Sequence, residues 1–149
     1  MRIENRKFHR EYQEIEKFEA GISLFGPEVK SVKTGSLKLD DAFVRIVGNE
    51  ALLINADIPI YQFTRPKGYE PKRTRKLLLH KKEILKIQVK LATGGKLTVA
   101  PIACYNKGRV LKLEIAIAKG RRDEEKKKLV KQRDIVIDQK REARDYMKK

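Results

Sequence analysis

The sequence has very little of what defines secreted and membrane proteins. Cys104 is the only cysteine, so no disulfide can form within the chain. No apolar run approaches the roughly 20 residues that span a bilayer. The first twelve residues, MRIENRKFHREY, lack the apolar segment of a secretory signal. These absences predict a cytoplasmic protein. The length of 149 residues is enough for one domain and an appendage.

Acidic residues are too few to balance the basic ones. The chain has 36 Lys and Arg against 20 Asp and Glu, a net charge of +16. Residues 119–149 account for +6, so the rest of the chain is basic as well. Such an excess repels itself unless a polyanion neutralises it, and nucleic acid is the expected partner. A membrane surface is disfavoured because no stripe of Trp, Phe or Leu opposes a basic one. A basic protein without a polyanion partner is the remaining alternative.

Apolar periodicity predicts several antiparallel strands with two short helices between them. The predicted elements are a strand over 12–25, a helix over 26–35, a hairpin over 42–58, a loop over 61–75, a helix over 81–95 and a hairpin over 96–118. The second helix could also be a strand, because Ile87 and Val89 are β-branched. This order is typical of a small closed or partly open β-barrel.

Single residues refine this prediction. On the first strand, a bend or bulge at Gly21 would give Ile15, Phe18, Ile22 and Leu24 one buried face. Gly26 and Pro27 favour a helix start, and Pro101 indicates an edge or a bulge. A barrel of this size is filled by its own side chains. We therefore expect function on its surface, in its loops or in its tail.

The charged C-terminal segment divides the chain into a barrel over 1–118 and a basic tail over 119–149. Leu129, Val136 and Ala143 recur every seven residues, but Arg133 and Lys140 interrupt the stripe. A helix with so thin an apolar stripe is marginal alone in water. The tail is expected to be disordered in the free protein and helical on its partner, with a helix packed on the barrel as the alternative.

Three blocks of the sequence resemble small protein B, the family that binds transfer-messenger RNA (tmRNA). They are ENRKFHREYQEIEKFEAGISLFGPEVKSVKTG, RTRKLLLHKKEI and EIAIAKG, and a basic tail follows them, as in the family. The resemblance implies a mainly β, oligonucleotide-binding-type barrel with short accessory helices. It also implies a role in trans-translation, in which the protein brings the tRNA-like domain of charged tmRNA to stalled ribosomes. The implied partners are tmRNA, the decoding centre of the small ribosomal subunit and, indirectly, elongation factor Tu.

The resemblance and the positive charges together select a set of RNA-binding candidates. Asn5, Tyr12, Glu19, Leu78 and His80 match family residues associated with RNA binding. Lysine and arginine neutralise phosphates and set affinity and salt dependence more than sequence choice. The basic candidates are Arg6, Lys7, Lys30, Lys33, Arg73, Arg75 and Lys76.

The tail candidates follow from the AKGKK-like opening of the family tail. The expected ribosome-contacting residues are Lys119, Gly120, Arg121, Arg122, Glu125, Lys126, Lys127, Lys131 and Arg133. Glu124 stands where the family usually has a ring. The resemblance implies that the tail probes the decoding centre and the empty messenger channel.

Other functions find less support in the sequence. His9 and His80 are too few for a metal site, and no cofactor motif is present. Asp40 and Asp41 are adjacent and would face opposite sides of a strand, so a nuclease is disfavoured and we expect no enzyme. The alternative kept open is a generic barrel that binds ribosomal RNA or single strands. Such binders gather aromatic residues on one face, whereas the ten Phe and Tyr here are scattered.

Overall fold

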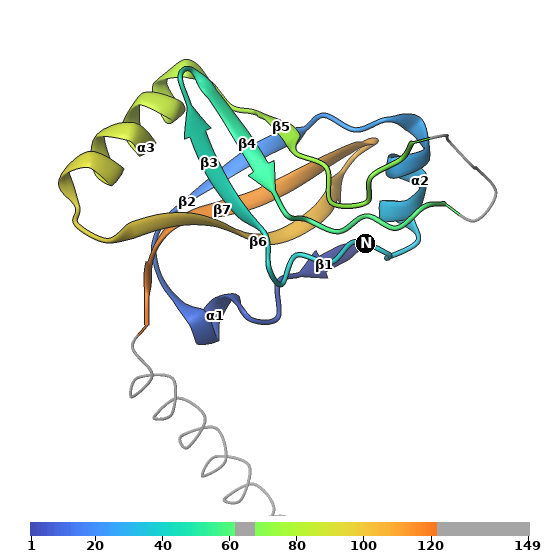
Figure 1. Ribbon diagram of the computed structural model, residues 1–149, viewed down its shortest axis with the longest axis horizontal. Coiled ribbons are helices and arrows are strands. Elements are labelled where there is room, and N and C mark those ends of the chain that lie inside the picture. The colour runs from blue at the N-terminus through green and yellow to red at the C-terminus, as the bar shows by residue number, and fades with distance from the viewer. Residues whose placement is uncertain (62–67, 122–149) are drawn as a thin grey trace, which may run out of the picture.

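The computed structural model describes residues 1–61 and 68–121. Within these residues no helix is both long enough and apolar enough to cross a membrane. The strands are β1 (Arg2–Glu4), β2 (Tyr12–Ile22), β3 (Phe43–Val47), β4 (Glu50–Ile54), β5 (Arg75–Leu78), β6 (Leu97–Lys107) and β7 (Val110–Gly120). The helices are α1 (Phe8–Glu11), α2 (Gly26–Lys33) and α3 (Lys81–Thr93). The protein is therefore mainly antiparallel β, with short helices around the sheet (Figure 1).

The sheet closes on itself. Its strand order is β1-β6-β3-β4-β5-β2-β7, and β7 also pairs with β6. All the described pairings are antiparallel. β1 stands at the end of the strand order and pairs with β6. Figure 1 shows α2 and α3 on opposite sides of this barrel, with α1 beneath the strands. In the described pairings β2 meets β5 only through Gly21 and Ile22, so the rest of β2 pairs with β7 alone.

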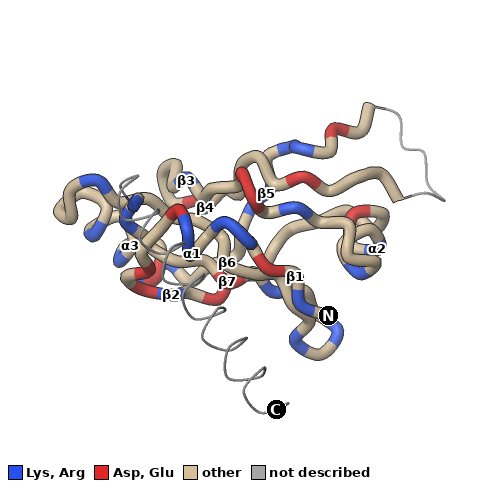
Figure 2. The backbone as a smooth tube through the Cα atoms, turned by 90° about the horizontal axis from the view of Figure 1, so that it is seen from below, with Lys and Arg blue, Asp and Glu red and all other residues tan. Residues whose placement is uncertain are grey.

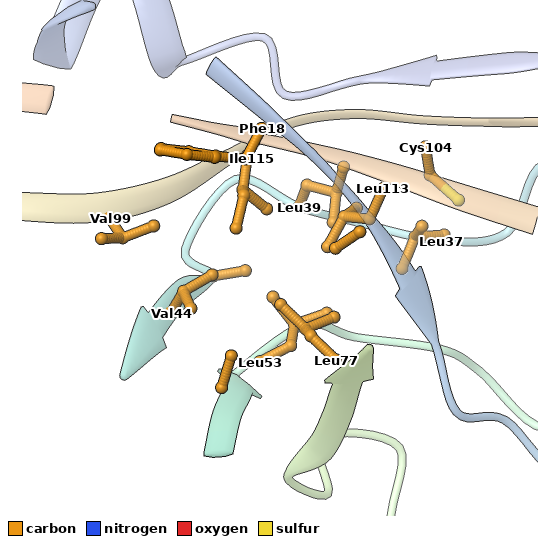
Figure 3. Packing of buried hydrophobic residues seen from close by; sticks show 14 of the residues in the cluster. Phe18, Leu37, Leu39, Val44, Leu53, Leu77, Val99, Cys104, Leu113 and Ile115 are labelled. Atoms are coloured by element: carbon orange, nitrogen blue, oxygen red, sulfur yellow. The ribbon is translucent and has the colours of Figure 1, made fainter. Parts of the chain in front are cut away.

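Strict alternation along β7 builds the centre of the core. Leu111, Leu113, Ile115 and Ile117 are buried and point into the barrel. Side chains from β2, β3, β4, β5 and β6 meet them there, as Figure 3 shows. Successive side chains of a strand point to opposite faces, so the intervening residues of β7 point outward. The barrel interior is thus filled by side chains, as the sequence predicted.

A second, smaller cluster lies outside the barrel wall. Phe8 of α1 is completely buried against Ala100, Ala116 and Ala118, with Tyr12 packed at the margin. Alanine side chains are short, so the backbone of α1 approaches the sheet closely. Neither α1 nor β1 was predicted, because both are too short to show a periodicity of their own.

The predicted helices and hairpins are confirmed, with changes of detail. α2 begins at Gly26 and α3 is a helix rather than a strand. The expected irregularity at Pro101 is present as a register shift between Pro101 and Ala103. The predicted bulge at Gly21 is wrong, because Gly21 pairs regularly with both neighbouring strands.

The register of β2 instead shifts between Glu14 and Glu16, which has a consequence for Ile15. The irregularity turns Ile15 outward, and 48% of its surface is exposed. Its expected place in the buried face is therefore wrong. The expected loop over 61–75 also ends earlier than predicted, because β5 begins at Arg75.

A buried ion pair joins β5 to α2. Arg75 has no exposed surface, and its Nε donates to Glu28 Oε2 at 2.8 Å. Its Nη1 donates to the carbonyl of Ala56 at 2.8 Å and its Nη2 to the carbonyl of Pro71 at 2.9 Å. The expectation that Arg75 contacts RNA phosphate is wrong, because a side chain enclosed in this way cannot reach a ligand.

Glu28 is the centre of this network. It is 1% exposed, and its second carboxylate oxygen pairs with Arg73. Burial alone would raise the pKa of Glu28, but hydrogen bonds from Arg73, the Phe25 amide and Arg75 outweigh it and hold the pKa below its ordinary value. The carboxylate is therefore ionised at neutral pH. It fixes the start of α2 against the segment that precedes β5.

Breaking this network should cost far more than removing an exposed ion pair on the same strand. We expect Arg75→Met to lower the free energy of unfolding by about 3–5 kcal/mol, because it leaves a buried carboxylate with an incomplete set of partners. Lys76→Met is the matched control, since the 3.4 Å pair between Lys76 and Glu50 is more than half exposed and is worth about 0–1 kcal/mol. Urea unfolding measures both. Equal losses would contradict the structural role.

The same network predicts an acid limb of stability. Because the pKa of Glu28 is lower in the folded than in the unfolded chain, its contribution is present above the ordinary glutamate pKa. That contribution is lost as the pH falls through the depressed value. Glu28→Gln should therefore lower the free energy of unfolding at neutral pH. This free energy should also change less with pH in the acid range than it does in the wild type, which unfolding curves at several pH values would measure. Parallel curves for the two proteins would refute this account.

Candidate nucleic-acid interface

Five residues from five strands form one row on the outside of the barrel. Leu78 of β5 pairs with Gly21 of β2, and Gly21 pairs with Lys112 of β7. Lys112 pairs with Tyr105 of β6, which pairs with Arg2 of β1. We call this row, together with Glu19 one outward position along β2, the outer face. Its members are far apart in sequence and adjacent only because the register brings them together.

Buried neighbours show that this row points away from the core. On four of its strands, the residues next to it are Leu77, Ala20, Leu113 and Cys104, each at most 2% exposed. Leu78, in contrast, is 58% exposed. A Cβ atom added to Gly21 would lie 3.2 Å from the Cβ of Leu78, so a larger residue there would displace Leu78. Gly21 therefore serves close approach between two strands.

Glu19 lies at the centre of a small polar cluster. The hydroxyl of Tyr105 donates to Glu19 Oε2, and Lys107 Nζ lies 3.1 Å from Glu19 Oε1. The hydrogen bond from Tyr105 and then that from Lys107 lower the pKa of Glu19, with a smaller effect from Lys112. Desolvation and the hydrogen bond to Glu19 raise the pKa of Tyr105 to about 12. At neutral pH the cluster therefore holds an ionised acceptor and a protonated phenol.

The N-terminal candidates lie at the α1 end of the same side of the barrel. Tyr12 is half-buried, with its ring centroid 5.7 Å from that of Phe8. It lines a cleft of about 340 Å³ together with Lys7 and Phe43. Tyr12 thus keeps part of its ring and its edge accessible beside a hollow in the surface.

Asn5 contributes in a different way from that expected. It is 5% exposed, its Nδ2 donates to the carbonyl of Pro101 at 2.9 Å, and its Oδ1 accepts from the Lys7 amide at 3.2 Å. Both polar groups are thus used inside the protein. The structure supports a role for Asn5 in anchoring the segment before α1, and it does not support direct contact with RNA. Arg6 and Lys7 are exposed, with Lys7 Nζ 3.7 Å from Asp41.

The remaining basic candidates form a second group around α2. Lys33 is exposed, and Lys30 Nζ lies 5.9 Å from the ring centroid of Tyr61. Arg73 is 26% exposed, pairs with Glu28 and lies 4.3 Å over the ring of Phe25. Of the two arginines preceding Lys76, only Arg73 keeps surface that a phosphate could contact.

His80 and Lys76 flank Leu78 at the β5 edge of the outer face. His80 is exposed at the start of α3, where its amide donates to Glu83 Oε1 at 3.2 Å. Lys76 points outward beside Leu78 and its pair with Glu50 is exposed. Figure 2, which views the side of the molecule where α1 and β1 lie, shows basic residues on several elements with acidic ones between them.

The first tail candidates belong to the barrel wall. Lys119 and Gly120 pair with Gln13 and Tyr12 as the last residues of β7, beyond the expected domain boundary at residue 118. The Arg121 amide donates to the Glu11 carbonyl at 2.9 Å, and its Nε lies within 3.2 Å of the carbonyl of Tyr12. The other tail candidates lie outside the described residues: Arg122, Glu125, Lys126, Lys127, Lys131 and Arg133.

Four residues of the interface were not selected from the sequence: Arg2, Tyr105, Lys107 and Lys112. The sequence feature that could have identified Tyr105, Lys107 and Lys112 is the second hairpin, β6 and β7. Its strands join through a two-residue turn at Gly108 and Arg109, so its register places Tyr105 opposite Lys112. Using that signal required knowing that the turn is two residues long.

Metal binding and thiol reactivity each place requirements on the described part of the chain. Within residues 1–61 and 68–121, His, Cys, Asp and Glu do not gather in any group of three that could hold a metal ion. Cys104 is buried, and burial raises its pKa to about 11, so its thiol is protonated at neutral pH. The interface offers hydrogen-bond acceptors, cations and exposed apolar surface, which suit recognition of a structured polyanion.

Comparison with known proteins agrees with this picture. The family model described as SmpB protein matches residues 2–147. The SsrA-binding protein of Mesoplasma florum is 44% identical over 143 residues, which cover 95% of this chain and 93% of that protein. The SsrA-binding protein of Sulfurihydrogenibium sp. is 46% identical over 131 residues, with 88% and 86% covered.

A solved structure shares the fold as well. A chain described under "tmRNA-SmpB: a journey to the center of the bacterial ribosome" superposes with a TM-score of 0.68 at 35% sequence identity. The match covers 87% of this chain and 94% of that one. The fold, the sequence relatives and the family model all agree, and this chain belongs to the SmpB protein family.

Proposed function

We propose that this protein binds tmRNA, the RNA for which its relatives are named, and acts with it in trans-translation on the ribosome. The observation that carries the proposal is the meeting of Glu19 and Leu78 on the outer face. The resemblance assigns both to RNA binding, and the pairing of β2 with β5 brings them onto one surface. Membership of the SmpB family and likeness to a chain described in a tmRNA–SmpB structure support the same function.

The distribution of charge supports binding on the outside of the barrel. The interior is filled by side chains, so a ligand can bind only on the surface. Exposed Arg6, Lys7, Lys33 and Lys76 offer phosphate contacts, while Tyr12 offers a ring and a hydroxyl. This combination suits a folded RNA, which is recognised by shape, 2′-hydroxyls and stacking. We assign the closed sheet to the oligonucleotide-binding type of barrel on the same grounds.

We further propose that residues 122–149 contact the ribosome, at the decoding centre and along the empty messenger channel. β7 ends beside α1 and Tyr12, so the segment begins next to the proposed RNA-binding surface. One protein could then bind the tRNA-like domain and ribosomal RNA together. Elongation factor Tu would be an indirect partner through the charged tmRNA, and such a role places the protein in the cytoplasm.

Leu78 offers a direct test of the RNA-binding surface. We expect Leu78→Ala to weaken binding to the tRNA-like domain of tmRNA about three- to tenfold, because an apolar contact at the interface is lost. Leu85→Ala is the matched control, since Leu85 on α3 is 57% exposed and Leu78 is 58% exposed. Filter binding or fluorescence anisotropy at fixed salt measures both variants.

The same assay separates tmRNA binding from general RNA binding. The wild-type protein should prefer the tRNA-like domain over a polypyrimidine strand of equal length, and its affinity should fall with salt. Equal affinity for the two RNAs would favour a generic single-strand-binding barrel. Equal effects of Leu78→Ala and Leu85→Ala would remove the outer face from the interface.

Truncation after Arg121 tests the tail. The shortened protein keeps all of β7 and the contacts of Arg121 with Glu11 and Tyr12. We expect it to bind the tRNA-like domain within about twofold of the full chain. Tagging of products on ribosomes stalled without a stop codon should be abolished, measured in a reconstituted translation reaction. Normal tagging by a well-folded truncated protein would refute the proposed tail function.

A further inference from the structure

A carboxylate on an RNA-binding surface needs an explanation. RNA presents phosphates, which repel an isolated Glu side chain. Glu19 is not isolated, because the Tyr105 hydroxyl and Lys107 Nζ each bind one of its oxygens. Lys112 contributes a further positive charge close enough to favour the ionised form. The outer face therefore offers a carboxylate whose charge is locally balanced and whose two oxygens are held in place.

The ring of Tyr105 is already engaged. The Arg2 guanidinium lies over it, 5.6 Å from the ring centroid, and β1 holds Arg2 in register opposite Tyr105. Tyr105 is half-buried, in contrast to the exposed residues that follow it on β6. The ring is thereby fixed between Arg2 and the sheet, and the hydroxyl is the group that reaches another functional residue. This geometry indicates that the Tyr105 hydroxyl positions the Glu19 carboxylate and that the Tyr105 ring does not stack on a base.

We propose that Tyr105 is a positioning residue for the RNA-contacting carboxylate of Glu19, and that Lys107 neutralises this carboxylate. The inference rests on the proposed function, because it gives Glu19 its role. Each carboxylate oxygen keeps a free lone pair after accepting one hydrogen bond. With both oxygens fixed, Glu19 accepts a hydrogen bond from a donor on the RNA, either a base amino or imino group or a ribose 2′-hydroxyl. The cluster of Glu19, Tyr105 and Lys107 therefore favours a hydrogen-bond donor of the RNA over a phosphate group.

A double-mutant cycle tests the positioning role. Tyr105→Phe keeps the ring and removes only the hydroxyl, so the contact with Arg2 and the fold should be retained. We expect it to weaken binding of the tRNA-like domain about three- to tenfold, the size of one ordinary protein hydrogen bond. In a Glu19→Ala background the same change should cause no further loss. If the two losses add in full, Tyr105 does not act through Glu19 and the inference is overturned.

Glu16 supplies a matched control on the same strand. It is also a carboxylate between two lysines, Lys86 and Lys90, which lower its pKa through hydrogen bonds. It points to the other side of β2, toward α3. Glu16→Ala should leave RNA affinity unchanged, whereas Glu19→Ala should weaken it. Equal losses would mean that the effect is not specific to the outer face and would overturn the inference, because a change of net charge alone would strengthen RNA binding in both variants.

Two further measurements separate positioning from general stability and from phosphate contact. In the free protein, NMR titration of the Tyr105 phenol should show a raised pKa that falls toward the ordinary value in Glu19→Ala. Glu114 and Arg2 also affect this pKa, Lys112 lies opposite Tyr105 and Lys107 contacts Glu19, and all four residues are unchanged in that variant. The slope of log affinity against log salt should be the same in Tyr105→Phe and wild type, because no phosphate contact is lost. A smaller slope would assign the effect to electrostatics and overturn the inference.

Modified RNAs identify the donor. Base analogues that each lack one amino or imino donor, such as inosine in place of guanosine, remove the base donors in turn, and 2′-deoxy substitution removes the ribose hydroxyl. At the contacted nucleotide, one of these should weaken binding of wild type and leave Glu19→Ala unaffected. If no position behaves this way while wild type binds normally, Glu19 receives no such donor and the inference is overturned, with the proposed function intact. Failure of wild type to bind the RNA at all would overturn both.

Discussion

β7 lies between β2 and β6 along almost its whole length, and the registers of these two pairings decide which side chains meet on each side of the wall. Toward the core they align leucines and isoleucines. Away from it they align Gly21, Lys112 and Tyr105, and bring Glu19 within reach of Tyr105. A slip of one residue would exchange the two faces and destroy the core and the proposed RNA-binding surface together. Stability and the proposed RNA binding therefore depend on the same strand pairings.

Two glutamates with lowered pKa values show how burial separates structural from functional groups. Glu28 is enclosed, and its arginine partners tie α2 to β5. Glu19 is held on the surface by a tyrosine and a lysine and keeps acceptor capacity toward solvent. Both carboxylates are ionised and hydrogen-bonded at neutral pH. Glu28 is too buried to meet a ligand, so accessibility is why the proposed binding role falls to Glu19 and not to Glu28.

Local pattern was enough to predict the long elements but not the contacts between distant segments. The alternation through Leu111–Ile117 and the Gly-Pro start of α2 were readable directly. β1, α1 and β5 are too short to show a periodicity of their own. They are stabilised by tertiary contacts: β1 pairs with β6, α1 packs on the alanine cluster and β5 pairs with β4. Arg75 was misassigned as an RNA contact because the sequence does not reveal its buried partner Glu28. The family resemblance supplied Glu19 and Leu78, but only the sheet register added Tyr105.

The proposed RNA-binding surface requires that RNA cover the outward side of the β6–β7–β2 wall. Lysine acylation read by mass spectrometry, with and without the tRNA-like domain of tmRNA, tests it directly. Lys107 and Lys112 should be shielded when RNA is bound, while Lys82 and Lys96, in and just after α3, should react as in the free protein. Shielding of Lys82 and Lys96 with Lys107 and Lys112 still reactive would place the RNA on another side of the barrel and contradict the account.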